Sequence, residues 1–203
     1  MIKQLLSSAL SAIPVSSNIL VFNSFPDYSD NAYAMFLYIY NKYGSKYRYV
    51  WLVNEANYIE NIIEDNKNRA HVSVIYKKSL KGIFLYLRAK HVFYTHGIFE
   101  SVHICQTPNK MINLWHGMPL KRIGLMDGKP LGYMHNLQYT IATSPLFQRI
   151  MADSFGVDRD HVLLTGQPRC DLFNLSTDFF ETNAIKEGDY KSIGVWMPTY
   201  RNS

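Results

Sequence analysis

The feature that most constrains the fold is an alternation between short apolar runs and stretches with helical spacing. Nearly continuous apolar strands that alternate with helices are typical of a parallel sheet covered on both faces. The pattern therefore predicts an α/β fold, a Rossmann-like doubly wound parallel sheet over residues 15–173. Seven runs are expected to form its strands: 18–25, 47–54, 72–76, 91–97, 110–117, 139–144 and 161–166.

Between these runs the sequence carries start and stop signals for helices. Asp30 is expected to cap a helix that begins near Asn31 and ends at Gly44. Ser144 and Pro145 open a later helix, because proline is preorganised for the first helical position after a serine cap. These signals place helices in the connections between the predicted strands.

The two ends of the chain are expected to lie outside the sheet. Residues 1–14 predict an amphipathic helix, which either packs on the domain or lies on a membrane surface. The polar, acidic segment 174–190 predicts a linker. The run 191–203 predicts the first strand of a second domain, which the sequence truncates. The apolar positions of the first segment are Ile2, Leu5, Leu6, Ala9, Leu10 and Ile13.

Composition narrows the class of protein. Hydrophobic residues make up 47% and charged residues 18%, which indicates a chain that buries a core. The net charge of +5 fits an anionic partner such as a phosphorylated substrate or a membrane surface, and equally a mildly basic solvated surface. Its Lys and Arg residues are scattered, so no nucleic acid is predicted as a partner. No apolar run approaches the roughly 18 residues of a membrane-spanning helix.

Several polar residues lie at or just after the carboxyl ends of the predicted strands. Ligands of open parallel sheets bind at the carboxyl ends of the strands, so we expect these residues to surround one cleft. They are Asp27, Ser29, Asp30, Asn31, Thr95, His96, Gly97, His116, Gly117, Thr143, Ser144, Thr165, Gly166, Arg169 and Asp171.

Among them, His116 is the predicted catalytic base. Histidine titrates near neutral pH and can take a proton from a hydroxyl group. Gly117 leaves room for a substrate close to the backbone, and Lys121, Arg122 and Arg169 are predicted to hold phosphate oxygens. The alternative is that His116 is a hydrogen-bonded structural residue at the rim of the core.

Metal, cofactor and nucleophile signatures are weak. His91, His96, His103 and Cys105 lie close together in sequence but without zinc-type spacing, so no metal site is predicted. The sequence contains no P-loop, no G-x-G-x-x-G and no G-x-S-x-G elbow. The two cysteines, the second being Cys170, form no paired motif, which favours a reducing compartment. No cofactor is predicted.

Four motifs follow one another along the chain: FPDYSDNAYAMF (25–36), INLWHGMPLKRIG (112–124), TGQPRCDLF (165–173) and MPTYR (197–201). Together they resemble the CDP-glycerol glycerophosphotransferase family, whose enzymes build the poly(glycerol phosphate) or poly(ribitol phosphate) chains of teichoic acids and some capsules. The resemblance covers nearly the whole chain. It departs from the family at Met118, where a threonine is common, and in ending soon after the last motif.

The resemblance implies a two-domain glycosyltransferase-B-like fold of which this chain is the N-terminal, acceptor-side half. It implies CDP-glycerol or CDP-ribitol as donor, a lipid-linked polyol-phosphate acceptor, release of CMP, and a peripheral enzyme on the cytoplasmic face of the membrane. His116 would be the base or would orient the acceptor. By the resemblance, Arg169, Asp171, Thr199 and Arg201 would line the cleft between the two domains. Taken together with the strand-end residues, the residues predicted to contact substrates are Asp30, Asn31, His96, Gly117, Lys121, Arg122, Arg169, Asp171, Thr199 and Arg201.

Two other functions stay open from the sequence. One is a non-catalytic remnant or membrane-binding module that uses the N-terminal helix and the basic loops. The other is a sugar-nucleotide glycosyltransferase of the same fold.

Overall fold

The fold is taken from a computed structural model that describes residues 13–99, 110–128, 137–174, 191–192 and 194. The chain divides into two compact units, Met1–Leu172 and Phe173–Ser203, and every described strand lies in the first. The predicted helix at 1–14, the linker and the strand at 191–203 lie almost wholly outside the described residues and stay predictions.

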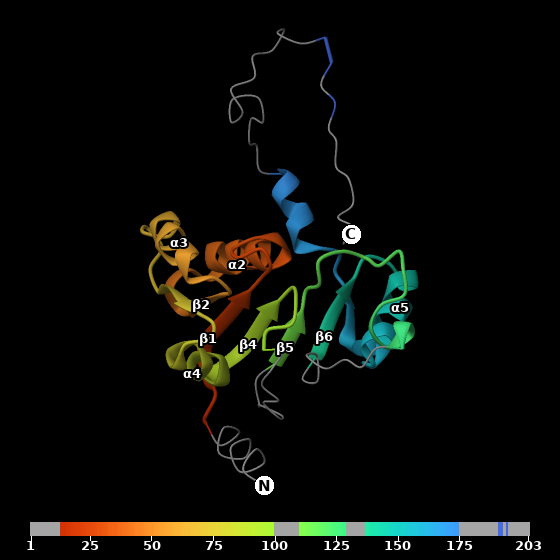
Figure 1. Ribbon diagram of the computed structural model, residues 1–203, viewed down its shortest axis with the longest axis horizontal. Coiled ribbons are helices and arrows are strands. Elements are labelled where there is room, and N and C mark those ends of the chain that lie inside the picture. Colours follow the sequence, from red (N-terminus) through yellow and green to blue (C-terminus); the bar gives the residue numbers. More distant parts are fainter. Residues whose placement is uncertain (1–12, 100–109, 129–136, 175–190, 193, 195–203) are drawn as a thin grey trace. The chain divides into compact units, whose positions relative to one another are not determined.

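A seven-stranded sheet forms the centre of the first unit, and all of its strand pairs are parallel (Figure 1). The order β3-β2-β1-β4-β5-β6-β7 reverses direction between β1 and β4, as in doubly wound folds. This confirms the predicted fold class. The strands are β1 (Ser16–Asn23), β2 (Arg48–Val53), β3 (Val72–Tyr76), β4 (Ala89–Tyr94), β5 (Lys110–Asn113), β6 (Leu137–Ala142) and β7 (Val162–Leu164).

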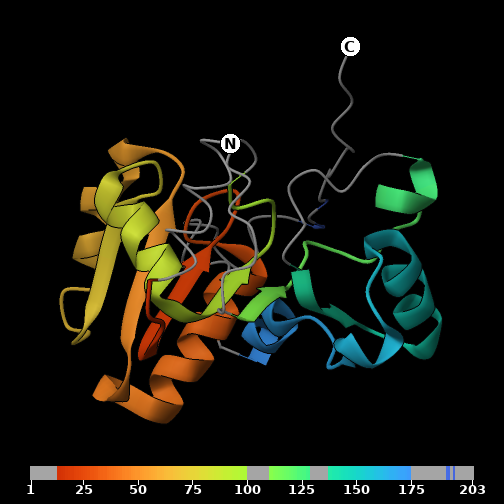
Figure 2. The same ribbon diagram turned by 90° about the horizontal axis from the view of Figure 1, so that it is seen from below.

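Helices cover both faces of the sheet, as Figure 2 shows. The α-helices are α2 (Asp30–Tyr43), α3 (Ile59–Asp65), α4 (Leu80–Arg88) and α5 (Pro145–Phe155). Short 3₁₀ helices are η1 (Gly44–Lys46), η2 (Ala56–Tyr58), η3 (Gly124–Asp127), η4 (Arg159–His161) and η5 (Pro168–Asn174). None of the described helices has both the length and the apolar character needed to span a membrane.

Strand periodicity divides the core into two layers. Alternate side chains of β1 point to opposite faces, so Val21 packs with Leu87 of α4, and Phe22 packs with Phe36 of α2. A smaller cluster joins α5 to β6 and β7. Because both faces are buried, β1 and β2 can be apolar almost throughout, which explains why the sequence shows runs rather than alternation.

The helix starts agree with the sequence in one case and differ in another. Ser144 caps α5, and its Oγ accepts a hydrogen bond of 3.3 Å from the backbone N–H of Phe147. The prediction that Asp30 caps α2 is wrong. Ser29 occupies the cap position, and Asp30 is the first helical residue, with φ of +60° and its carboxylate turned to a distant arginine.

Candidate active site

The carboxyl ends of β1, β4 and β5 lie side by side at the point where the strand order reverses. Two hydrogen bonds extend the sheet pairing just past the strands. The N–H of Thr95 donates to the carbonyl of Asn23 at 3.2 Å, and that of Leu114 donates to the carbonyl of Tyr94 at 2.8 Å. The residues that follow are therefore placed by the sheet itself, which is how an open α/β sheet builds a ligand site.

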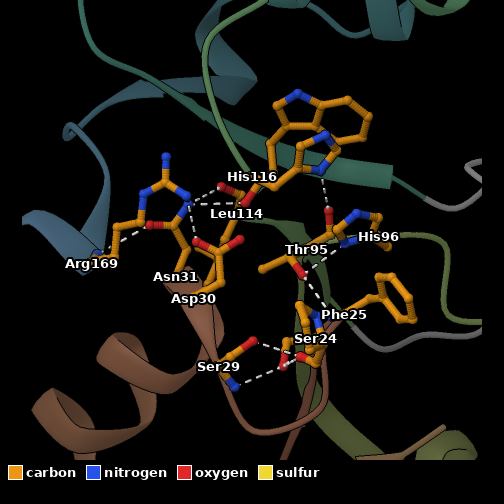
Figure 3. Close-up of polar contacts among 12 residues, drawn as sticks. Ser24, Phe25, Ser29, Asp30, Asn31, Thr95, His96, Leu114, His116 and Arg169 are labelled. Carbon is orange, nitrogen blue, oxygen red and sulfur yellow. Dashed lines mark hydrogen bonds and ion pairs between the residues drawn. The ribbon is translucent and has the colours of Figure 1, made fainter. Parts of the chain in front are cut away.

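Two histidines meet at this edge. The rings of His96 and His116 are stacked, with centroids 4.3 Å apart and an angle of 12° between their planes. Thr95 contacts both rings, as Figure 3 shows. Its carbonyl oxygen lies 3.3 Å from Nδ1 of His116, and its hydroxyl lies 3.1 Å from Nδ1 of His96.

These contacts assign a tautomer to His116. A carbonyl oxygen only accepts hydrogen bonds, so Nδ1 of His116 must carry the proton and donate it to Thr95. In the neutral ring Nε2 is then unprotonated, and the side chain is exposed. His116 therefore presents a basic nitrogen away from Thr95, as a general base requires.

The environment of His96 favours its uncharged form. Burial and, to a lesser degree, the neighbouring His116 lower the pKa of His96 to about 4, while Asp30 acts in the opposite direction. At neutral pH the His96 ring is therefore uncharged. A neutral ring against His116 adds no repulsion when His116 takes up a proton.

Trp115 holds the histidine turn in an unusual backbone conformation. Its φ is +47°, a strained value for a bulky residue. Its backbone N–H donates to Oδ1 of the buried Asn113 at 2.8 Å. The centroid of its indole lies 4.0 Å from that of the His116 ring and 5.0 Å from that of the Phe155 ring. Packing on α5 and the Asn113 contact together fix the strained turn that aims His116.

Asn31 joins three segments beneath the site. Its side-chain amide donates to the carbonyls of Leu114 at 3.1 Å and Trp115 at 2.9 Å, and its oxygen accepts from the N–H of Arg169 at 3.1 Å. The residue is fully buried. Its contact with substrate stays a prediction, and its observed contacts position the His116 turn and the segment that begins η5.

Asp30 and Arg169 form an ion pair of 2.8 Å at the same edge. The Asp30 side chain is 12% exposed, and that of Arg169 is 40% exposed. Nη2 of Arg169 lies 3.7 Å from the position that a Cβ on Gly117 would occupy, so the guanidinium lies beside the turn that carries His116. Figure 3 shows the two side chains next to Asn31.

The other predicted residues are exposed, have a structural role, or fall outside the described residues. Lys121 and Arg122 are exposed in the loop after Gly117, and Asp171 is exposed on η5. Thr199 and Arg201 fall outside the described residues. Asp27 accepts hydrogen bonds from the backbone of Asn54 and Glu55, which gives it a structural role.

Sequence reasoning placed Thr95 at the cleft without a specific role, and it gave no role to Trp115 or Asn113. The available signal was their place, because all three lie within the last five residues of a predicted strand that ends in His-Gly. No group of three potential metal ligands occurs among the described residues.

Comparison with known proteins gives the site its context. The profile of the family CDP-Glycerol:Poly(glycerophosphate) glycerophosphotransferase matches residues 5–203. The chain belongs to this family. A curated member, the teichoic acid glycerol-phosphate transferase of Staphylococcus aureus (strain NCTC 8325 / PS 47), is 29% identical over a 216-residue alignment that covers 95% of this chain and 52% of the relative.

Solved structures of the wall teichoic acid polymerase TagF share the fold of this glycerophosphotransferase-family chain. One gives a TM-score of 0.64 at 20% identity, and it covers 88% of this chain and 46% of TagF. A TagF variant soaked with CDPG gives a TM-score of 0.67 at 20% identity, with 90% and 47% covered. The chain thus spans about half the length of the relatives that it matches.

Proposed function

We propose that this chain is the acceptor-side part of an enzyme that transfers glycerol phosphate from CDP-glycerol to the hydroxyl end of a polyol-phosphate acceptor and releases CMP. The observation that carries the proposal is the arrangement of His116, whose Nδ1 is bound to the carbonyl of Thr95 and whose Nε2 is left as a base. Family membership supplies the reaction class, and the CDPG used with the TagF variant supports the donor.

The reaction would proceed by attack of an acceptor hydroxyl on the β-phosphorus of the donor. The hydroxyl proton passes to Nε2 of His116 as the new P–O bond forms. The bond between the β-phosphorus and the bridging oxygen breaks, and CMP leaves with the electron pair. General-base help of this kind contributes about 100-fold to 10,000-fold to a rate.

Arg169 is suited to hold the acceptor near this base. Nη1 of its guanidinium is bound to Asp30, and Nη2 lies beside Gly117. A guanidinium fixed in this way can present its remaining donors to a phosphate oxygen. We assign it to a phosphate of the acceptor chain, because His116 on the adjacent turn takes the acceptor hydroxyl.

A lipid-linked acceptor and a peripheral place on the cytoplasmic face of the membrane are part of the same proposal. An exposed apolar residue and two exposed cations follow His116: Leu120 is 99% exposed, and Lys121 and Arg122 come directly after it. An exposed apolar side chain next to two cations, close in sequence to the active-site turn, suits an anionic lipid surface.

Release of CMP tests the donor and acceptor assignments. The complete protein is incubated with CDP-glycerol, CDP-ribitol or a UDP-sugar, with and without an acceptor that ends in glycerol phosphate. The proposal predicts nucleotide release from CDP-glycerol only when the acceptor is present. Release from a UDP-sugar would favour a glycosyltransferase, and no acceptor-dependent release from any donor would favour a binding module.

A further inference from the structure

Thr95 is the common partner of the two active-site histidines, and it treats them differently. Towards His116 it offers a backbone carbonyl, which can only accept a proton. Towards His96 it offers a hydroxyl, which can accept and also donate. The same residue therefore can set opposite tautomers in two stacked rings.

The burial of Thr95 decides the direction of its hydroxyl. Its Oγ1 accepts a hydrogen bond of 3.4 Å from the backbone N–H of Phe25, and the residue is fully buried, so its hydroxyl hydrogen needs a protein acceptor. Of these two partners, only the His96 ring can accept that hydrogen, through Nδ1. A neutral His96 whose Nδ1 accepts must carry its proton on Nε2.

We propose that His96 and His116 form a donor–acceptor pair that recognises the vicinal diol at the end of a glycerol-phosphate acceptor, with Thr95 setting both tautomers. His116 Nε2 accepts the proton of the attacking hydroxyl. His96 Nε2–H donates to the oxygen of the adjacent hydroxyl. This inference rests on the proposed function and adds the acceptor group that the site selects.

The geometry of the stack suits two neighbouring oxygens. The rings lie face to face 4.3 Å apart, and each is anchored to Thr95 through Nδ1, so each Nε2 lies on the side of its ring away from that anchor. Hydrogen bonds of about 2.8 Å from adjacent rings can converge on oxygens carried by adjacent carbons. Glycerol esterified at one terminal oxygen ends in two such hydroxyls.

The surroundings of His96 keep it a neutral donor over the working range. The ring of Phe25 meets that of His96 edge-on, with centroids 5.7 Å apart, and the centroid of the Trp115 ring lies 6.5 Å from that of His96. The titratable groups that act on His96 are His116, which opposes its protonation, and Asp30, which favours it. Burial outweighs Asp30 and keeps the pKa of His96 low.

The test compares two acceptors on two forms of the complete protein. One acceptor ends in glycerol phosphate, and the other ends in 1,3-propanediol phosphate, which keeps a primary hydroxyl and lacks the adjacent one. His96→Phe keeps an aromatic ring against His116 and removes both nitrogens. We expect the wild type to favour the glycerol end in kcat/KM by about threefold to tenfold, the range of one neutral hydrogen bond, and His96→Phe to lose that preference.

A preference that survives in His96→Phe, or no preference in the wild type, would overturn the inference. Thr95→Val removes the hydroxyl and keeps the carbonyl that holds His116, so it should lose the preference, while Thr95→Ser should keep it. The proposed function fails separately, because its failure means no acceptor-dependent release of CMP from any form of the protein.

The tautomers can also be read without turnover. Nitrogen NMR of histidine-labelled protein distinguishes Nδ1–H from Nε2–H rings. We expect neutral Nε2–H for His96 and neutral Nδ1–H for His116 at pH 8, and His96 to remain neutral at pH 5.5. An Nδ1–H tautomer at His96, or a protonated His96 at pH 5.5, would contradict the inference.

Discussion

Replacing Asn31 by alanine should measure how strongly the fold holds the His116 turn. The change removes three hydrogen bonds, to the carbonyls of Leu114 and Trp115 and from the N–H of Arg169. Each is worth about 1 kcal/mol net, so we expect the free energy of unfolding to fall by about 3 kcal/mol. That is a large share of the roughly 5–15 kcal/mol typical of a domain.

The assay is urea unfolding followed by circular dichroism. With a slope of about 2 kcal/mol per molar urea, the midpoint should fall by about 1.5 M. Asn41→Ala is the matched control, because Asn41 is exposed on the same helix and undergoes the same change in helix propensity. If both variants shift the midpoint equally, Asn31 does not hold the turn, and the positioning role is wrong.

Three further predictions test other parts of the structure. Gly82→Ala should lower the free energy of unfolding by about 1–3 kcal/mol, although alanine has the better helix propensity. The new Cβ would lie 2.6 Å from the carbonyl oxygen of Tyr76 and 2.8 Å from that of Lys77. A variant that is more stable in urea would refute this steric account. Because the pKa of His96 is lowered in the folded protein, the unfolded chain binds more protons between about pH 4 and 6.5. The free energy of unfolding should therefore fall as the pH drops through that window, and it should fall less steeply in His96→Phe. Equal pH dependence of the two proteins in urea titrations would contradict this. Asp30→Asn should change the free energy of unfolding by about 1 kcal/mol or less, since the ion pair is partly exposed and asparagine tolerates a positive φ. It should still raise KM for the acceptor, because Arg169 loses the partner that holds its guanidinium. An unchanged KM would show that Asp30 does not position Arg169 for the acceptor.

The order and type of the elements could be predicted from the sequence because they depend on local patterns. Apolar runs identified each of the seven strands, and the run 72–76 matches β3 residue for residue. The run 110–117 was predicted too long, since β5 ends at Asn113. Two residues further on, Trp115 adopts a positive φ that is incompatible with a strand, and its residue type does not reveal this.

The polar contacts of the site could not be predicted, because they join segments that are distant in sequence. Asp30 was read as a local helix cap, but its partner Arg169 is 139 residues away. Asn31 was predicted to contact substrate, and the sequence gave no sign that its amide also binds residues that lie 83, 84 and 138 positions further along the chain. Their positions at strand ends made these residues candidates for the site. Only the three-dimensional contacts distinguish residues that position the site, such as Asn31, from residues that are exposed in it, such as His116.

The most direct test of the central claim is the turnover of His116→Gln in the complete protein, measured as acceptor-dependent release of CMP from CDP-glycerol. His161→Gln is the control, because His161 is an exposed histidine in η4. It precedes β7 and so lies at the amino end of a strand, whereas the site lies at the carboxyl ends. The account predicts a loss of at least about 100-fold in kcat for His116→Gln and none for His161→Gln. Equal turnover in the two variants would contradict it, because the base would then lie elsewhere.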